Sequence, residues 1–410
     1  MLSSHVEVME WTSWSNVKFN ERHLLPSCSG IYVIADINQC VWYVGQAANL
    51  KNRWAGRSHH KLEKATLKKA NLSGAYMHEA NLSEANLNGA NFSGADLKQV
   101  NLMRVDLSHA DLSKVNLMNA NLEGANLENT NLLHSYYDSA TIFPTGFNAA
   151  QAGAYLIAPG ASLQNANLAG ANLYKVNLTE ADLQGVNLNS ANMEGADLSE
   201  SKLNGANLSK AILNNARLLQ SNLVQINLSE ANLNGADLTT ANLCEANLSK
   251  TNLSSTKLVA ANLSKTNMSH AILESANLRA ADLKGSNLIH VNLKFANLIA
   301  ADLSKANLKN AKFDGYTKLN DANLAGVNLV GVTLRGDFSG ANFNETNLCG
   351  ADLSSLNLSG TSLISSELRG ANLTNANLIQ ANLKDANLTG ANLDGAKLTG
   401  TIMPDGTTHE

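Results

Sequence analysis

Over most of its length after about residue 62, the chain repeats a pattern of apolar and polar positions with a period of five residues. Two consecutive quintets, 166–170 and 171–175, read Ala-Asn-Leu-Ala-Gly and Ala-Asn-Leu-Tyr-Lys. The central position is apolar and usually Leu, a small residue such as Ala lies two places before it, and Asn or Asp lies between them. The last two positions vary. The pattern therefore predicts a core with one large apolar side chain per quintet.

A period of five fits neither a helix nor a straight strand. Successive central residues would lie about 140° apart around an α-helix, and they would alternate between the two faces of a strand. A coil that turns a corner after each quintet keeps every central residue inside, and four corners close a square of about twenty residues. Coils about 4.8 Å apart would be joined as hydrogen-bonded strands are. The period therefore predicts an all-β solenoid.

Each position of the quintet has a physical reason in this geometry. The narrow axis admits only a small residue beside each Leu. Asn and Asp favour turns because their side chains bond nearby backbone groups, and stacked Asn side chains can also bond from coil to coil. Gly in the fifth place, as at Gly170, Gly185 and Gly205, suits a corner with positive φ.

The repeat resembles the pentapeptide-repeat family, and the resemblance covers most of the chain. It implies a right-handed quadrilateral β-helix with Leu and the small residue on the axis. The expected core residues of the first coils are Leu67, Leu72, Met77, Leu82, Leu87, Phe92, Leu97, Leu102 and Leu107. The implied fold says little about function, because a solenoid mainly offers surface.

The quintets fall into two blocks, which predict a first solenoid at residues 62–134 and a second at 162–403. A non-repeat break at 135–161 separates them, and a tail follows at 404–410. Residues 1–61 lack the repeat and are expected to form a small α+β cap.

Two details of the repeat predict local structure. Thr141–Gly146 and Thr401–Gly406 share the pattern Thr-Ile-x-Pro-x-Gly, which indicates that the same ending is used twice. Within the second block, the register gains one residue near Gly315–Tyr316 and loses one near Gly336. We expect a bulge at the first place and a tightened corner at the second.

The cap contains two apolar runs with strand character, Gly30–Ala35 and Val41–Gly45, which predict a hairpin, and a helix is expected at residues 49–55. This segment resembles the GIY-YIG nuclease family through Gly30-Ile31-Tyr32 and Tyr43-Val44-Gly45. In that family, two Tyr, an Arg and a His surround the scissile phosphate, and a downstream Glu holds a divalent metal.

The resemblance implies catalytic roles for Tyr32, Tyr43, Arg53 and His59, with Mg²⁺ as the cofactor of a nuclease. The metal-binding Glu of the family has no counterpart here, because the repeat begins where the second half of the nuclease fold should follow. We therefore expect a degenerate cap without a working catalytic or metal site.

Two groups of side chains could contact a ligand. A basic cluster, formed by Arg53, Arg57, His59, His60 and Lys61, is either a solvated face or a weak contact to nucleic-acid phosphates. His270 and His290 lie one coil apart and would stack on one face, which favours a surface pair over a metal site.

Composition narrows the classes of function. The 410 residues carry 30 Lys and Arg against 34 Asp and Glu, a formal net charge of −4. This balance argues against a strongly basic nucleic-acid binder and against a heavily acidic mimic of DNA. The four Cys lack metal-ligand spacing and are expected to be reduced thiols in a cytoplasmic protein, and neither a signal peptide nor a membrane span is evident.

These observations predict a non-catalytic scaffold that binds a protein partner of unknown identity through its solenoid faces, without a cofactor, a membrane or a small-molecule substrate. The cap would add at most a weak contact to DNA. Two alternatives remain. One is a GIY-YIG-type metal-dependent DNA endonuclease, and the other is a DNA-mimicking protein that interacts with gyrase, as some pentapeptide-repeat proteins do. A mimic needs an acidic stripe, whereas the second block has nearly equal numbers of acidic and basic residues.

Overall fold

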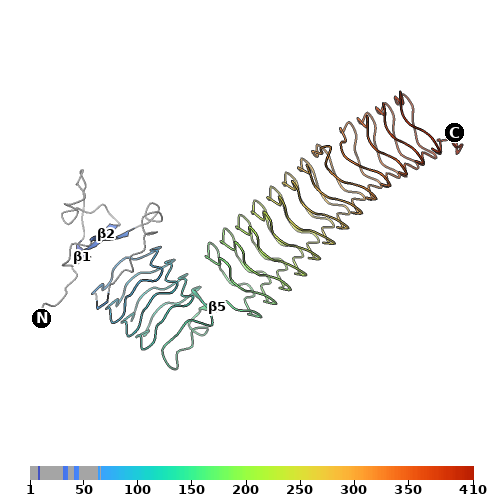
Figure 1. Cartoon of the computed structure of the whole chain (residues 1–410). Coiled ribbons are helices and arrows are strands. Elements are labelled where there is room, and N and C mark those ends of the chain that lie inside the picture. Colours follow the sequence, from blue (N-terminus) through green and yellow to red (C-terminus); the bar gives the residue numbers. More distant parts are fainter. Residues whose placement is uncertain (1–7, 10–30, 36–40, 46–62, 65) are drawn as a thin grey trace, which may run out of the picture. The chain divides into compact units, whose positions relative to one another are not determined.

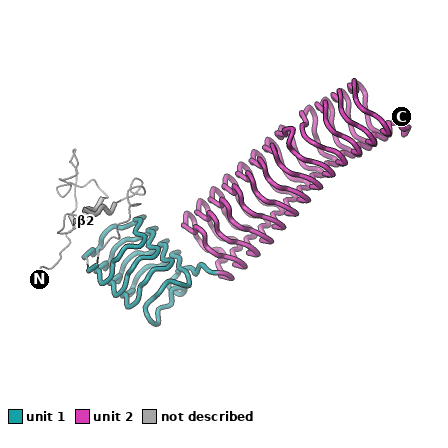
Figure 2. Tube along the Cα trace, viewed as in Figure 1, with its two compact units in different colours: residues 1–158 teal, residues 159–410 magenta. Residues whose placement is uncertain are grey.

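The computed structural model of the chain describes residues 8–9, 31–35, 41–45, 63–64 and 66–410. The chain divides into two compact units, residues 1–158 and 159–410, which Figure 2 shows in different colours. Each unit contains a stack of square coils, traced along the sequence in Figure 1. No described residue lies in a helix, and accordingly no membrane-spanning helix is found in this part of the chain.

Three short strands lie among the described residues that precede the coils. β1 (Val8–Met9), β2 (Ile31–Ala35) and β3 (Val41–Gly45) form an antiparallel sheet in the order β1-β2-β3. β2 pairs with β3 along the full length of both strands, which confirms the predicted pairing of the two apolar runs. The helix expected at residues 49–55, and with it the α+β character of the cap, lies outside the described residues.

Parallel bridges join the coils, in most cases between residues twenty positions apart. The bridging residue is the one before each central Leu, so that Asn227 pairs with Asn207 on one side and Asn247 on the other. The amide of Asn227 donates to the carbonyl of Ala206 at 2.9 Å, and the amide of Leu228 donates to the carbonyl of Asn247 at 2.8 Å. A bridge recurs on each side of the square. These ladders confirm the quadrilateral β-helix.

The axis of each stack is filled by the central residues and the small residues of the quintets. Every central residue named for the first coils is buried, with Met77 and Phe92 in place of Leu. Where Ser or Thr takes the small position, its hydroxyl in most cases donates to backbone, as Ser201 does to the carbonyl of Leu198 at 2.6 Å. An exception is Ser286, whose buried hydroxyl has no hydrogen-bond partner among the described residues. The core is therefore apolar, and most of its few hydroxyls are satisfied within the coils.

The fifth position of the quintet has positive φ at nearly every corner, whether Gly or another residue occupies it, with Gly315 as an exception. Gly170, Gly185 and Gly205 have positive φ, as predicted. Lys175, at the same position one quintet after Gly170, has a φ of 54°. A non-glycine residue at such a corner carries some backbone strain, which is smallest for Asn and Asp and largest for bulky side chains.

The two predicted changes of register are confirmed. Asn297 bridges to Lys318, twenty-one positions on, and Lys318 bridges to Asp337, nineteen positions on. The extra residue lies at the corner that contains Tyr316, and the missing one at the corner that contains Gly336, which has a φ of 128°. The ladder therefore absorbs one inserted residue and returns to its regular spacing one coil later.

The first stack continues past residue 134 into the stretch without repeat. Within that stretch, β4 (Tyr136–Tyr137) pairs in parallel with β5 (Tyr155–Leu156), and Ile142 bridges to the preceding coil. The two Thr-Ile-x-Pro-x-Gly segments begin alike, because the hydroxyls of Thr141 and Thr401 each donate to a Leu carbonyl of the preceding coil. After the second segment the chain turns back, and Thr408 pairs antiparallel with Ile402.

Candidate functional site

Of the nuclease residues suggested by the sequence, Tyr32 and Tyr43 lie in the described part of the chain. Tyr32 lies in β2 opposite Val44, and Tyr43 lies in β3 opposite Val33, so the two tyrosines are not cross-strand partners. The other candidates lie outside the described residues: Arg53, Arg57, His59, His60 and Lys61. The candidate surfaces that can be described are therefore those of the coil stacks.

Side chains at the same quintet position form columns along each stack, and one column of the second unit consists of Asn. Asn187 donates through Nδ2 to Oδ1 of Asn167 at 3.2 Å, and Asn227 donates to Asn207 in the same way at 3.2 Å. Asn247 continues the series with Asn227 at 3.2 Å. The predicted ladder of stacked Asn is confirmed, and it makes this face polar and fixed in geometry.

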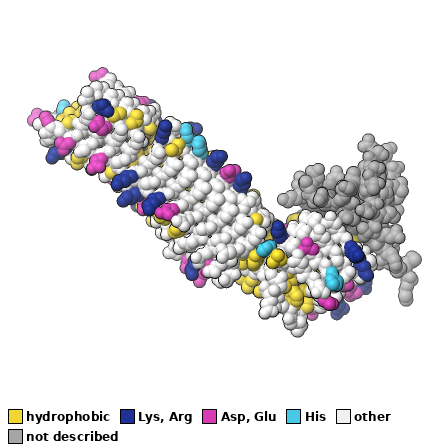
Figure 3. All heavy atoms as spheres, turned by 180° about the vertical axis from the view of Figure 1, so that it is seen from behind, with side chains coloured by type: hydrophobic (Ala, Val, Ile, Leu, Met, Phe, Trp, Pro, Cys, Tyr) yellow, Lys and Arg dark blue, Asp and Glu magenta, His cyan; other side chains and the backbone are white. Residues whose placement is uncertain are grey.

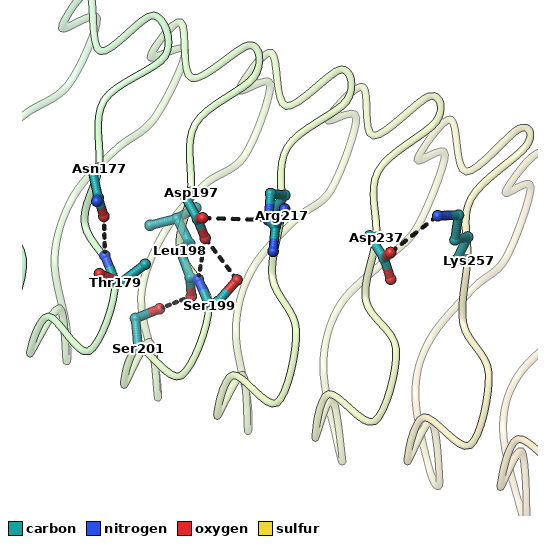
Figure 4. A network of polar contacts seen from close by, with 9 residues as sticks. All are labelled: Asn177, Thr179, Asp197, Leu198, Ser199, Ser201, Arg217, Asp237 and Lys257. Atoms are coloured by element: carbon teal, nitrogen blue, oxygen red, sulfur yellow. Dashed lines mark hydrogen bonds and ion pairs between the residues drawn. The ribbon is translucent and has the colours of Figure 1, made fainter.

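The carboxylates in the Asn position serve as turn residues, as predicted. Oδ1 of Asp197 accepts hydrogen bonds from the amide of Ser199 at 3.0 Å and from its hydroxyl at 2.6 Å (Figure 4). The same bond to the amide two residues on recurs at the other Asp residues of this kind: Asp182, Asp237, Asp282 and Asp302. These carboxylates hold corners and do not converge on a metal.

Several charges of the second unit are compensated between neighbouring coils. Arg217 lies 3.3 Å from Asp197, and Lys257 lies 3.2 Å from Asp237 (Figure 4). Burial alone would raise the pKa of Asp237, but hydrogen bonds from Thr239 and Lys257 outweigh it and lower that pKa. On the face shown in Figure 3, Lys and Arg side chains lie among Asp and Glu side chains rather than forming a stripe of one sign.

A tighter ion pair lies beside the shortened corner of the second unit. Nη2 of Arg335 is 2.9 Å from Oδ2 of Asp352. Hydrogen bonds from Ser354 and Arg335 lower the pKa of Asp352 to about 2. The charge of this carboxylate therefore persists well into acid and fixes Arg335 against the stack.

His270 and His290 stack as the sequence predicted, with ring centroids 4.8 Å apart and an interplanar angle of 17°. Asn310, one coil further on, places Nδ2 3.4 Å from Nε2 of His290. In the described part of the chain, no group of three His, Cys, Asp or Glu side chains could hold a metal ion. The arrangement is a surface column of planar side chains.

A second planar column was missed in the sequence. Phe295 and Tyr316, called here the aromatic pair, stack with centroids 5.3 Å apart and an interplanar angle of 13°. They are 49% and 72% exposed, respectively. The signal that could have found them is an aromatic residue at a corner in each of two successive coils, on either side of the inserted residue. Large exposed apolar side chains of this kind often mark binding surfaces.

Asp314 holds the backbone of both aromatic residues. Its Oδ1 accepts hydrogen bonds from the amides of Phe295 and Tyr316, each at 3.1 Å, and from the hydroxyl of Thr317 at 2.9 Å. Burial alone would raise the pKa of Asp314, but these bonds outweigh it and lower that pKa. The aromatic pair is therefore presented from a corner with fixed backbone geometry.

Three exposed lysines, called here the lysine rim, surround the aromatic pair. Lys294 directly precedes Phe295 in the chain. Lys312 and Lys318 bridge to Asn292 and Asn297, the two ladder residues that flank Phe295. None of the three lysines forms an ion pair with the residues that the structure describes. The corner that carries the aromatic pair thus has three lysines without an ion-pair partner in this part of the chain, beside the carboxylate of Asp314.

The stretches matched by the model of the pentapeptide repeat family, which spans eight copies of the repeat, cover most of the two stacks. They merge into residues 61–99, 101–132, 160–315 and 337–403. The gap at 316–336 coincides with the coil whose register is shifted. No curated protein matches the chain at the threshold of the search.

Solved structures also match the chain. HetL, a pentapeptide repeat protein involved in heterocyst differentiation regulation from the cyanobacterium Nostoc sp. strain PCC 7120, is 34% identical. The match covers 58% of this chain and 94% of HetL, with a TM-score of 0.23. QnrB1, a plasmid-mediated fluoroquinolone resistance protein, is 21% identical over 40% of this chain and 84% of its own, with a TM-score of 0.30.

A further match is Rfr23 from the cyanobacterium Cyanothece 51142, a pentapeptide repeat protein. It is 39% identical over 23% of this chain and 61% of its own length, with a TM-score of 0.19. The family model alone covers more than half of the present chain, in the same residues that form the bridged coils. The chain therefore belongs to the pentapeptide-repeat family.

Proposed function

We propose that the chain is a non-catalytic scaffold that binds a protein partner through the outer columns of its second unit. The observation that carries the proposal is the exposure of large apolar side chains at outward positions that the repeat otherwise fills with polar residues. In the second unit these side chains are Tyr174, Ile212, Ile272, Phe295, Tyr316 and Val330. These side chains are not buried within the coils, and contact with a partner protein would remove their apolar surface from water.

The interior of the stack supports a role without catalysis. The axis holds Leu and small residues, and most of its hydroxyls bond to backbone, as Thr251 does to the carbonyl of Leu228 at 2.8 Å. The ionisable side chains of the described coils lie outside the axis. A reaction needs convergent groups shielded from water, and flat outer columns favour recognition instead.

Affinity capture with the full-length chain, followed by titration of the captured protein in purified form, tests the proposal. We expect a saturable one-to-one complex with a specific protein. If purified candidates bind no better than they bind an unrelated solenoid, the scaffold proposal is wrong.

The nuclease alternative needs a separate test, because Arg53 and His59 lie outside the described residues. We expect no nicking of supercoiled plasmid in the presence of Mg²⁺ or Mn²⁺, and hence no cofactor. Nicking by the wild-type chain that is lost in Tyr32→Phe or Arg53→Ala would replace the scaffold proposal with a nuclease.

The DNA-mimic alternative is disfavoured by the charges of the second unit. Several acidic side chains there are paired with bases of the next coil, as Glu245 is with Lys265 at 3.2 Å, and on the face shown in Figure 3 the others are interspersed with Lys and Arg. A mimic needs uncompensated negative charge along one face. We therefore expect no potent inhibition of gyrase supercoiling by the purified chain, and strong inhibition would favour the mimic.

A further inference from the structure

We propose that the aromatic pair and the lysine rim form a docking site for an acidic protein segment that presents an aromatic side chain. The inference rests on the proposed scaffold function and adds to it a place on the molecule and a chemistry for the partner. The site comprises Phe295 and Tyr316 with Lys294, Lys312 and Lys318.

The fold does not require the two aromatic residues. An equivalent corner with one extra residue occurs in the first unit, where Oδ1 of Asp138 accepts hydrogen bonds from the amides of Asn119 at 2.8 Å and Ala140 at 3.2 Å. Thr141 completes that corner with a hydroxyl bond to Asp138 at 2.9 Å. Asn119 and Ala140 thus occupy the positions of Phe295 and Tyr316. The corner forms without rings, so the rings are not needed to build it.

Phe295 is placed where a large apolar residue is disfavoured. Its φ is 60°, and among the described residues with positive φ it is the only large apolar side chain. Bulky residues in this region of φ and ψ are uncommon because their Cβ crowds the backbone. A residue that strains the backbone and exposes 49% of its surface contributes little to folding, which indicates a role in binding.

The stack of rings is open on one side. Phe295 covers one face of the Tyr316 ring. The next corner toward the C-terminus contains Arg335 and Gly336, and Arg335 is directed to the carbonyl of Leu334 and to Asp352. Gly336 has no side chain to extend the column. An aromatic side chain of a partner could therefore stack on Tyr316 as Phe295 does, since offset or tilted ring pairs are favourable.

The three lysines of the rim form no ion pair with the described residues. Two nearby carboxylates are bonded to neutral Asn side chains instead: Asp337 accepts hydrogen bonds from Asn320 at 2.6 Å and Asn357 at 3.1 Å, and Glu274 accepts one from Asn292 at 3.1 Å. Elsewhere in the unit, bases such as Arg217 and Lys257 are paired with the neighbouring coil. An acidic partner would complement the three unpaired lysines and would associate faster at low salt.

Single-stranded nucleic acid also combines aromatic stacking with positive charge, but the size of the site disfavours it. The rings and lysines occupy two adjacent coils, roughly 5 Å along the axis at the spacing of strands. Proteins that bind single strands track about 4–16 nucleotides with a continuous basic groove. A short acidic segment fits the smaller patch, and its aromatic residue would serve as the anchor.

The test is a selection of random dodecapeptides displayed on phage against the full-length chain. A Phe295→Asn, Tyr316→Ala double variant serves for counter-selection. It reproduces the residues of the corner at Asp138, and Asn tolerates positive φ better than Phe, so the variant should fold normally. Tyr174→Ala is the matched control, because Tyr174 is another exposed ring beside a lysine, with Nζ of Lys175 5.0 Å from the ring centroid.

We expect the wild-type chain to enrich acidic peptides that contain an aromatic residue. Their synthetic forms should bind the double variant about tenfold more weakly and the Tyr174→Ala control unchanged, by fluorescence anisotropy. Lys312→Gln with Lys318→Gln should also weaken binding and reduce its dependence on salt.

Two outcomes would overturn the inference. Peptides that bind the wild-type chain and the double variant equally would show that the aromatic pair is not a docking site, and the scaffold proposal would stand if protein capture were retained. Binding of a labelled dT12 oligonucleotide that depends on Phe295 and Tyr316, with no acidic peptide selected, would assign the site to nucleic acid instead.

Discussion

Leu243 and Asn242 are neighbours in the chain with opposite environments. Leu243 is fully buried on the axis, whereas Asn242 lies on the outer face, where its Oδ1 accepts hydrogen bonds from the amide of Cys244 at 3.2 Å and from Asn262 at 3.1 Å. The stability of a coil therefore depends mainly on what fills the axis, and the outer residue contributes a turn and one rung of a ladder.

The first prediction compares these two residues. Leu243→Ala should lower the free energy of unfolding by about 2–5 kcal/mol, because the coils above and below prevent collapse around the cavity. Asn242→Ser should cost less than about 1 kcal/mol, since Ser can still form the local turn. Denaturant titration of both variants provides the comparison, and equal losses would contradict the assignment of inner and outer positions.

The second prediction concerns Asp352, whose pKa falls from 3.8 in a model peptide to about 2 in the folded chain. A lowered pKa in the folded state adds stability that is complete above the unfolded pKa and disappears as the pH falls through the folded value. Asp352→Asn should therefore be less stable than the wild type at pH 7, and the difference should shrink between about pH 4 and pH 2. Thermal melts across this range measure it, with Arg335→Gln as a second variant expected to reduce the same pH dependence.

At the scale of the coil, the number of residues varies at the corners, whereas the bridged positions keep their pairing. The corner at Gly336 is shorter than the others, and a Cβ there would collide with the carbonyl oxygen of Thr317. That carbonyl already accepts the amide of Asp337 at 3.2 Å. Gly205 also has positive φ, but space around it is open. Gly336 is therefore required for steric reasons, whereas Gly205 is favoured only by its backbone conformation.

The third prediction follows from this difference. Gly205→Ala should cost about 1 kcal/mol, the strain of a Cβ in left-handed backbone. Gly336→Ala should cost about 3 kcal/mol or more, because the ladder at Thr317 and Asp337 must also shift. Denaturant titration should rank the two variants in this order, and a reversed order would show that the corner at Gly336 can relax.

Counting residues between leucines was sufficient to predict the coil, the buried positions and both changes of register, because each depends only on the period. It did not reveal the aromatic pair, since Phe295 and Tyr316 are brought together only after the extra residue has been assigned to its corner. The repeat period also gave no information on the structure or role of the N-terminal cap. The pairing of β2 with β3 followed from local strand character, whereas the nuclease roles of Tyr32 and Arg53 depended on a resemblance to half of a fold.

At the scale of the whole molecule, the backbone bridges described here mostly join a coil to its immediate neighbours. Stability in such stacks is approximately a sum of terms between adjacent repeats. The two units, residues 1–158 and 159–410, have their own cores. A destabilising substitution in one coil should therefore affect mainly that coil and its neighbours.

The fourth prediction uses this locality. Leu243→Ala should speed amide hydrogen exchange in the coils around residues 223–263 and leave the first unit, for example residues 87–107, unchanged. Exchange monitored by mass spectrometry provides the map. Uniform acceleration along both units would instead indicate that the chain unfolds in one cooperative step.

The corner at Asp314 has a consequence for how such a chain can vary over time. A single carboxylate secures the surplus residue, and Gly336 removes the offset one turn later, so every leucine downstream keeps its place on the axis. A one-codon insertion would shift all subsequent side chains of an ordinary strand, but here its effect is confined to one coil. Related sequences could thus acquire new exposed side chains, such as that of Tyr316, without changes to the core.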